Sequence, residues 1–186
     1  ALGGLLVLLP VIGVIAGAVK LEDGGPVLYE QERTAVFGET FSIFKFRTMT
    51  PEGESATPVA DEKNDRITRV GRLLRQTHLD EIPQLWSILR GDMSVVGPRA
   101  VWTEEEHILE DDAEMWRKRW FVKPGLTGLA QINDASSVDP GVKLRYDLQY
   151  VREQSFVYDT KIVARQLWKV GVDVVDAVLG TGDRVE

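Results

Sequence analysis

Residues 1–20 read ALGGLLVLLPVIGVIAGAVK, and this stretch decides the architecture that the sequence predicts. No charged side chain interrupts it before Lys20. A straight helix of this length, rising about 1.5 Å per residue, would nearly cross a hydrocarbon core about 30 Å thick. The stretch is therefore expected to form a helix that prefers an apolar environment, and Lys20 marks the return to water.

Pro10 lies at the midpoint of this stretch and is expected to break the helix. It has no N–H group to donate, and its ring clashes with the carbonyl group of Leu6. Each arm would then have about 9 residues and a length of roughly 14 Å, which reaches through one leaflet only. From these residues alone three structures remain open: a re-entrant helix, a spanning helix with a proline kink, and a buried helix of a soluble protein.

Length, charge and cysteine content exclude several classes of protein. The chain has 186 residues and a formal net charge of -7, from 22 Lys and Arg against 29 Asp and Glu. The length fits one domain with a core of its own, and the acidic balance argues against nucleic acid as a partner. Because cysteine is absent, a disulfide scaffold, a thiolate zinc site, an iron–sulfur cluster and a cysteine nucleophile are excluded.

Beyond residue 20 the hydropathy pattern predicts an α+β domain that is mostly helical and contains a small β-hairpin. Strands are expected at residues 27–29 and 41–46, with a turn at 36–39 between them. Helices are expected at residues 65–75, 80–89, 104–120, 142–153 and 156–179, and loops at 51–58, 97–99 and 124–133. The predicted organisation is a membrane segment at 1–20 followed by one globular domain at 21–186.

The segment LDEIPQL, residues 79–85, carries the most chemical information. Pro83 suits the first turn of a helix, where its missing N–H costs nothing, and this places Asp80 at or near the N-cap. The free N–H groups of a helix N-terminus favour carboxylate and phosphate. Two adjacent acids such as Asp80 and Glu81 can hold a divalent ion, and one of them can act as a nucleophile. The ordinary alternative is that Asp80 only caps the helix and Glu81 is a first-turn acid.

Several cations are spaced as phosphate ligands would be. Arginine recurs every three residues on the helix expected at 65–75, at Arg66, Arg69, Arg72 and Arg75. A solvated face or a membrane-surface contact is the ordinary reading of such a stripe, but Arg75 lies only five residues before Asp80.

Lys45 and Arg47 alternate with aromatic residues on an expected strand, while Pro98 and Arg99 present a guanidinium from a stiff turn. Together with a membrane segment, these groups suit a pyrophosphate substrate whose reaction partner lies in the lipid.

Six segments in order give the chain a resemblance to a known family. They are GPV (25–27) with QER (31–33), FKFRTM (44–49), RVGRLLR (69–75), LDEIPQL (79–85), GDMSVVGPR (91–99) and KPGLTGLAQIN (123–133). No single segment is decisive, but the series and its spacing are highly specific. The chain resembles the bacterial sugar transferases, which are polyprenyl-phosphate hexose-1-phosphate transferases, also called monotopic phosphoglycosyl transferases.

The resemblance implies a reaction and roles for the two acids. A sugar 1-phosphate would pass from a nucleoside diphosphate sugar, usually a UDP-sugar, to a polyprenyl phosphate. The family chemistry is ping-pong, so Asp80 matches the nucleophile that attacks the sugar-bearing phosphorus, and Glu81 matches its acidic partner. Mg²⁺ is the implied ion, with Asp80 and Glu81 as its ligands.

The resemblance also implies where the other groups belong. Lys45, Arg75, Arg99 and Pro98 match positions around the substrate phosphates. Residues 1–20 match a re-entrant helix broken at Pro10, which would hold residues 21–186 as a catalytic domain on the cytoplasmic face of the membrane.

One departure from the family pattern concerns the donor. Many members continue Gln-Val-Asn-Gly-Arg where this chain has Gln131-Ile132-Asn133-Asp134-Ala135, so the arginine thought to help hold the nucleotide is missing. Two other functions stay open: a membrane-tethered Mg²⁺-dependent nucleotidyltransferase or phosphohydrolase, and a non-catalytic membrane scaffold. The intact Asp80-Glu81 pair argues against the scaffold.

Overall fold

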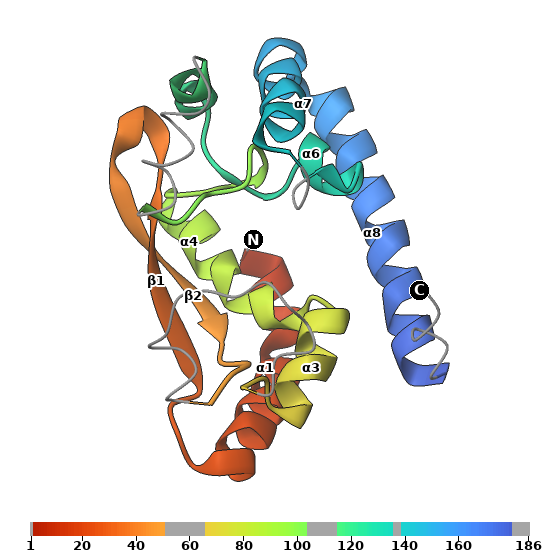
Figure 1. Cartoon of the computed structure of the whole chain (residues 1–186). Coiled ribbons are helices and arrows are strands. Elements are labelled where there is room, and N and C mark those ends of the chain that lie inside the picture. Colours follow the sequence, from red (N-terminus) through yellow and green to blue (C-terminus); the bar gives the residue numbers. More distant parts are fainter. Residues whose placement is uncertain (1, 51–65, 104–114, 136–138, 180–186) are drawn as a thin grey trace. The chain divides into compact units, whose positions relative to one another are not determined.

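The computed structural model describes residues 2–50, 66–103, 115–135 and 139–179 (Figure 1). Its residues form two compact units. The first unit contains Ala1–Glu30, Phe44–Leu85 and Val170–Glu186, and the second contains Gln31–Ile43 and Trp86–Lys169. Helices and two small sheets are both present, so the predicted α+β class is confirmed.

The first element is the helix α1, Leu2–Asp23, which continues through Pro10. A proline inside a helix removes one hydrogen bond and bends the axis more readily than it ends the helix. In the described part of the chain, no helix meets the length and apolarity needed to cross a membrane. The re-entrant path of residues 1–20 stays a prediction.

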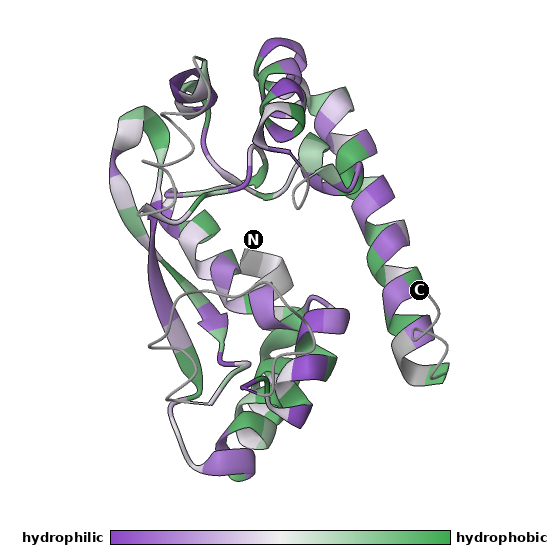
Figure 2. Cartoon of the chain, in the orientation of Figure 1, coloured by the Kyte–Doolittle hydropathy of each residue, from purple (hydrophilic) through white to green (hydrophobic). Residues whose placement is uncertain are grey.

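Among the described side chains of helix α1, apolar residues lie on two faces, and one of these faces packs against the rest of the first unit. Ile15 and Val19 are buried in a cluster with Phe46, Leu74 and Ile82 of the same unit. The other face leaves large apolar side chains exposed, namely Val7, Leu9, Val14 and Leu21. Figure 2 shows the apolar middle of α1 and its hydrophilic C-terminal end. An apolar face without a protein partner is typical of a surface that meets lipid or another apolar body.

The predicted hairpin is present, with a longer first strand. Strand β1 is Leu28–Thr34 and strand β2 is Thr40–Phe46. The turn between them contains the 3-10 helix Val36–Gly38. Phe37 and Gly38 both have a positive φ, 58° and 80°, and this left-handed pair reverses the chain.

Helix α3, Arg69–Gln76, starts later than the sequence pattern suggested. Thr68 is its N-cap, and its hydroxyl accepts from the N–H of Gly71 at 2.9 Å. Ile67, expected inside the helix, instead pairs with Met49 in an antiparallel bridge. A Cβ on Gly71 would overlap the backbone of Thr48, so this position needs a glycine for close packing.

The segment after α3 differs most from its prediction. Residues Leu79–Gln84 form a 3-10 helix, and only then does the α-helix α4, Leu85–Arg90, begin. Pro83 therefore lies inside the 3-10 helix and not in the first turn of an α-helix. His78 is the N-cap and is left-handed, with φ 56°, so the chain turns sharply between α3 and the acid pair.

The second unit contains a parallel strand pair that the sequence pattern did not predict. Strand β3, Ser94–Val96, pairs with β4, Gly125–Thr127, with Ser94 opposite Gly125 and Val96 opposite Thr127. A side chain on Gly125 would overlap the backbone of Gly97. Glycine at these two positions is thus explained by the close approach of two backbones.

Helices and 3-10 turns complete the second unit. The 3-10 helix Trp116–Phe121 is the described end of the helix expected at 104–120, whose residues 104–114 lie outside the described part. Helix α6, Leu129–Ile132, lies where a loop was expected. Helices α7, Pro140–Glu153, and α8, Phe156–Leu179, agree with the predictions, and α8 has the same bounds.

The core of the second unit is built around Tyr150. This residue is buried with Val96, Leu129, Ile132 and Ile162. Its hydroxyl lies within hydrogen-bond distance of the carbonyl of Val96 (3.1 Å) and the carboxylate of Asp159 (3.0 Å). Burial, and then the hydrogen bond to Asp159, raise the pKa of Tyr150. The side chain thus joins strand β3 to helices α7 and α8 as a neutral hydrogen-bonding group.

Candidate functional site

The acid pair lies in the first unit, on the 3-10 helix Leu79–Gln84. Asp80 is 9% exposed, and it occupies the second position after the N-cap residue His78. The prediction that Asp80 lies at or near a helix N-cap is confirmed, but the helix is a 3-10 helix, and its N-cap is the left-handed His78, two residues before Asp80. A buried acid among backbone turns is a common feature of reaction centres.

Lys45 from strand β2 contacts the acid pair directly. Its Nζ atom lies 2.7 Å from Oε1 of Glu81, and both side chains are largely buried. A charge-assisted hydrogen bond of this length fixes the positions of both side chains. The structure thus brings three of the predicted site residues, Lys45, Asp80 and Glu81, to one place.

Arg75 is held close to the same segment of chain. Its Nε atom donates to Oγ1 of Thr48 at 2.9 Å. Thr48 is buried and lies three residues after Lys45, so it fixes the approach of Arg75 from helix α3. Arg69 and Arg72, by contrast, are exposed, as expected of a solvated or membrane-facing stripe.

Arg47 does not join the cations expected at the phosphates. Strand β2 ends at Phe46, and the buried guanidinium of Arg47 forms an ion pair with Asp23 at the end of α1. The alternation that placed Lys45 and Arg47 on one side of a strand is interrupted because the strand stops between them. Arg47 is therefore a contact between helix α1 and the segment after β2.

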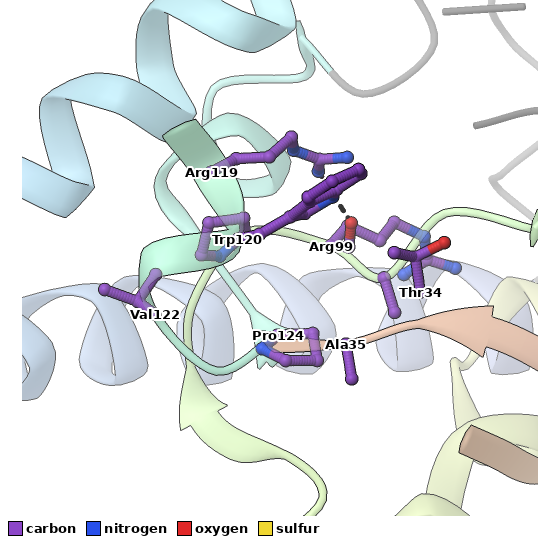
Figure 3. A pocket seen from close by; sticks show the side chains of 9 residues that line it. Thr34, Ala35, Arg99, Arg119, Trp120, Val122 and Pro124 are labelled. Atoms are coloured by element: carbon purple, nitrogen blue, oxygen red, sulfur yellow. Dashed lines mark hydrogen bonds between the residues drawn. The ribbon is translucent and has the colours of Figure 1, made fainter. Parts of the chain in front are cut away.

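Pro98 and Arg99 belong to the second unit, where they line a small hollow (Figure 3). The other residues at its wall are Thr34, Ala35, Ala100, Arg119, Trp120, Val122 and Pro124. A guanidinium beside an aromatic ring can hold an anion and a flat group together. The predicted position of Pro98 and Arg99 around the phosphates at the acid pair stays a prediction.

A buried ion pair supports this hollow. Arg119 is 3% exposed and Asp147 is 1% exposed, and Nη2 of Arg119 lies 2.9 Å from Oδ2 of Asp147. Nη2 of Arg119 also donates to the carbonyl of Arg99 at 2.7 Å, and the guanidinium lies over the ring of Trp116 at 4.2 Å. Arg119 therefore fixes the backbone from which Arg99 projects.

The position where the family pattern has an arginine is filled differently in this chain. Ala135 is buried, which leaves no polar side chain there. The preceding Asp134 has a positive φ of 55°, a conformation that suits the glycine of the family pattern. Its carboxylate forms an ion pair with Lys169 of helix α8. The charged groups next to position 135 are thus Asp134 and Lys169, which the family motif does not include.

The two acids fit a magnesium ion that is shared with a substrate. In the described part of the chain, no group of three or more His, Asp or Glu side chains is arranged as a metal site. Mg²⁺ in phosphoryl-transfer sites is commonly held by one or two carboxylates together with substrate phosphates and water. Asp80 and Glu81 meet that requirement, but they do not form a protein cage for a metal.

Sequence reasoning missed the groups that depend on distant parts of the chain. Asp23 and Arg47 are 24 residues apart, and Arg119 and Asp147 are 28 apart. No local motif joins either pair, because a carboxylate and an arginine are common residues at any spacing. Trp120 carried no signal either, since its place at the hollow depends on the turn of the 3-10 helix Trp116–Phe121.

Comparison with known proteins identifies relatives over nearly the whole chain. The family described as bacterial sugar transferase matches residues 1–173. The UDP-glucose:undecaprenyl-phosphate glucose-1-phosphate transferase of Escherichia coli K12 is 40% identical over 171 residues, 89% of this chain and 37% of that protein. The exopolysaccharide production protein ExoY of Rhizobium meliloti is 40% identical over 179 residues, 88% of this chain and 78% of that protein.

A third relative matches a somewhat shorter part of this chain. The uncharacterized sugar transferase EpsL of Bacillus subtilis is 40% identical over 152 residues, 82% of this chain and 73% of that protein. The chain thus spans little more than a third of the E. coli protein and about three quarters of the two shorter relatives.

Proposed function

The chain belongs to the bacterial sugar transferase family, and from this membership and the acid pair of the first unit we propose that it is a phosphoglycosyl transferase. It transfers a sugar 1-phosphate from a nucleoside diphosphate sugar to a polyprenyl phosphate in the membrane. A UDP-sugar is the proposed donor, and UDP-glucose is the first to test because the E. coli relative is named for it. The product is a polyprenyl diphosphate sugar, on which a glycan can be built.

The single observation that carries this proposal is the surroundings of Asp80. The carboxylate is buried on a tight 3-10 helix, its neighbour Glu81 contacts Lys45 at 2.7 Å, and the unit that contains them also contains α1. A nucleophile for phosphorus has to be anionic, held in place, and surrounded by cations that offset repulsion from the substrate. The burial of Asp80 and the Lys45 ammonium beside its neighbour Glu81 support this role for Asp80.

In the proposed first step, a carboxylate oxygen of Asp80 attacks the sugar-bearing phosphorus of the donor. The bond from that phosphorus to the bridging oxygen breaks, and the nucleoside monophosphate leaves with the electron pair. Asp80 then carries the sugar phosphate as an acyl phosphate. Lys45 and Arg75, which belong to the same unit as Asp80, are the proposed partners of the phosphate oxygens.

In the proposed second step, a phosphate oxygen of the lipid attacks the phosphorus of this adduct. The bond to Asp80 breaks and the carboxylate is regenerated, so the enzyme returns to its starting state. Glu81, held in place by Lys45 at 2.7 Å, is the proposed acidic partner of Asp80 in this step. The exposed apolar face of α1 is the proposed contact with the lipid, with the acid pair on the cytoplasmic side.

Mg²⁺ is the proposed cofactor, with Asp80 and Glu81 as its protein ligands. When bound, it neutralises phosphate charge and so weakens the repulsion between the substrate and the attacking carboxylate. The protein groups supply the rest: Lys45 fixes Glu81, and Thr48 fixes Arg75.

The ping-pong order can be tested without the lipid. Enzyme in membranes or nanodiscs is mixed with labelled UDP-sugar and Mg²⁺, quenched, and examined by intact mass. We expect one added hexose phosphate per active site on Asp80, one nucleoside monophosphate released, and discharge of the adduct when polyprenyl phosphate is added.

Two other outcomes would redirect the proposal. Intersecting initial-rate lines with no adduct would favour direct transfer, and Asp80 would then be a base or a metal ligand. Continuous nucleotide release at full rate without any lipid would instead favour the tethered hydrolase.

A further inference from the structure

Three polar side chains attach the C-terminal end of α1 to the segments that follow it in the first unit. Asp23 forms an ion pair with Arg47. The carboxylate of Glu22 accepts from the backbone N–H of Arg69, at 2.7 Å, at the start of helix α3. Lys20 Nζ donates to the carbonyls that follow α1, at Gly24 (2.7 Å) and Gly25 (3.1 Å). A linker that only tethered a membrane helix would not need such contacts.

The arginine of the Asp23–Arg47 ion pair lies in the interior of the first unit. The Arg47 side chain is 1% exposed, and a Cβ on Gly25 would overlap its guanidinium. Glycine at position 25 thus leaves the space that the guanidinium fills. Among the described residues, Nε and Nη1 of Arg47 have no hydrogen-bond partner, so Asp23 is the group that compensates this buried charge.

The segment that contains Arg47 also carries the reactive groups. Two residues before Arg47, Lys45 contacts Glu81 at 2.7 Å. One residue after it, Thr48 accepts from Arg75 at 2.9 Å. Residues 45–48 therefore join the end of α1, the acid pair and a phosphate-binding cation through three successive side-chain contacts.

The two substrates depend differently on the position of α1. In the proposed function the nucleotide sugar is dissolved in water, so its reaction with Asp80 does not require α1 to hold the acid pair at a defined depth in the lipid. A polyprenyl phosphate is held by the membrane, so its height against Asp80 depends on how α1 holds the first unit at the lipid. Misplacing a reacting group by about 1 Å can slow a reaction about a hundredfold.

We propose that the Asp23–Arg47 ion pair is a positioning contact that fixes α1 relative to the acid pair, and that the transfer to the lipid acceptor depends on it while the reaction with the nucleotide sugar does not. This inference rests on the proposed function. Neither residue touches a reacting atom, and both act through the segment 45–48.

The test separates the two half-reactions in the Asp23→Asn variant. Asp23→Asn is preferred over a change at Arg47, because Asp23 is 23% exposed and its loss is better tolerated than a change in the buried partner. Glu39→Gln, on the exposed hairpin turn, is the matched control for loss of one acid. We expect wild-type adduct formation from UDP-sugar alone, and at least about tenfold slower discharge to a long-chain polyprenyl phosphate in vesicles.

A soluble acceptor makes the test specific for position. With a short-chain polyprenyl phosphate that dissolves in water, the Asp23→Asn variant should discharge its adduct within about twofold of wild type. Equal losses in both half-reactions, or a loss with the soluble acceptor as well, would mean a merely structural role and would overturn the proposal. Discharge to the long-chain lipid at the wild-type rate would overturn it too.

A spectroscopic measurement keeps the inference separate from the proposed function. Because the chain has no cysteine, spin labels can be placed at Val14 and Leu73, both exposed and both in the first unit. We expect a broader distance distribution in Asp23→Asn than in wild type, and an unchanged distribution would overturn the inference. If the wild-type protein formed no adduct and transferred no sugar phosphate, the proposed function would fail instead, whatever the labels reported.

Discussion

Two buried arginines, one in each unit, form ion pairs of different construction. Arg119 in the second unit is paired with Asp147, which is 1% exposed. The Arg119 guanidinium also donates to the backbone carbonyl of Arg99 and lies over the ring of Trp116. Arg47 in the first unit is paired with Asp23, which is 23% exposed. Arg119 is thus part of a closed polar network, whereas Arg47 is compensated by a carboxylate that water can reach.

The difference indicates different roles for the two ion pairs. A closed network of buried charges gives one fixed geometry and is costly to open, as suits the wall of a hollow. An ion pair with a solvent-accessible partner is easier to change without unfolding the protein. The first unit, which carries the acid pair, should therefore lose activity before stability, and the second unit should lose stability first.

The largest expected effect is on activity and comes from the first unit. Asp80→Asn should reduce turnover by more than about a thousandfold, because an amide is not a nucleophile for phosphorus. The melting temperature should stay within a few degrees of wild type, since the amide has nearly the same shape and keeps one acceptor oxygen. Turnover assays and thermal unfolding of the same preparation test both parts, and residual activity of more than a few per cent would remove Asp80 from this role.

The second expected effect is on stability and comes from the second unit. Arg119→Ala should lower the free energy of unfolding by about 3–5 kcal/mol, because it leaves the carboxylate of Asp147 buried without its partner. The double variant Arg119→Met with Asp147→Leu is the control, and it should recover most of this loss by removing both charges. Urea unfolding measures both variants. Equal destabilisation by the single and double variants would show that the ion pair matters less than the shape of Arg119.

The smallest expected effect is the pH dependence of the Asp23–Arg47 contact. The backbone N–H of Gly25 and then the Arg47 guanidinium lower the pKa of Asp23 below its usual 3.8, against the opposite effect of its burial. The unfolded chain therefore takes up this proton first as the pH falls, so the contribution to stability is full above about pH 5 and is lost progressively as the pH falls through 3.8 towards the lowered pKa. The stability difference between wild type and Asp23→Asn should shrink between pH 5 and 3, whereas a constant difference would contradict the assignment.

The sequence by itself determined the elements that depend on local pattern. The helix Phe156–Leu179 follows from apolar spacing over 24 residues, and the hairpin follows from alternation on both sides of a turn. The placement of Asp80 and Glu81 in the first turn of a helix was also predictable, because the signal is a continuous stretch of seven residues. These features depend on neighbours in sequence, and a local pattern contains all the information about them.

Tertiary structure alone decided the features that join distant segments. Strands β3 and β4 have three residues each, too short for any hydropathy period, and they exist because Gly97 and Gly125 allow two backbones to approach. The N-cap residue is His78 and not Asp80, because a left-handed turn after α3 starts a 3-10 helix two residues before Asp80. Arg47, which the sequence grouped with the phosphate-binding cations, is instead the partner of Asp23. A buried guanidinium needs a carboxylate partner, and the sequence alone does not show which distant carboxylate supplies it.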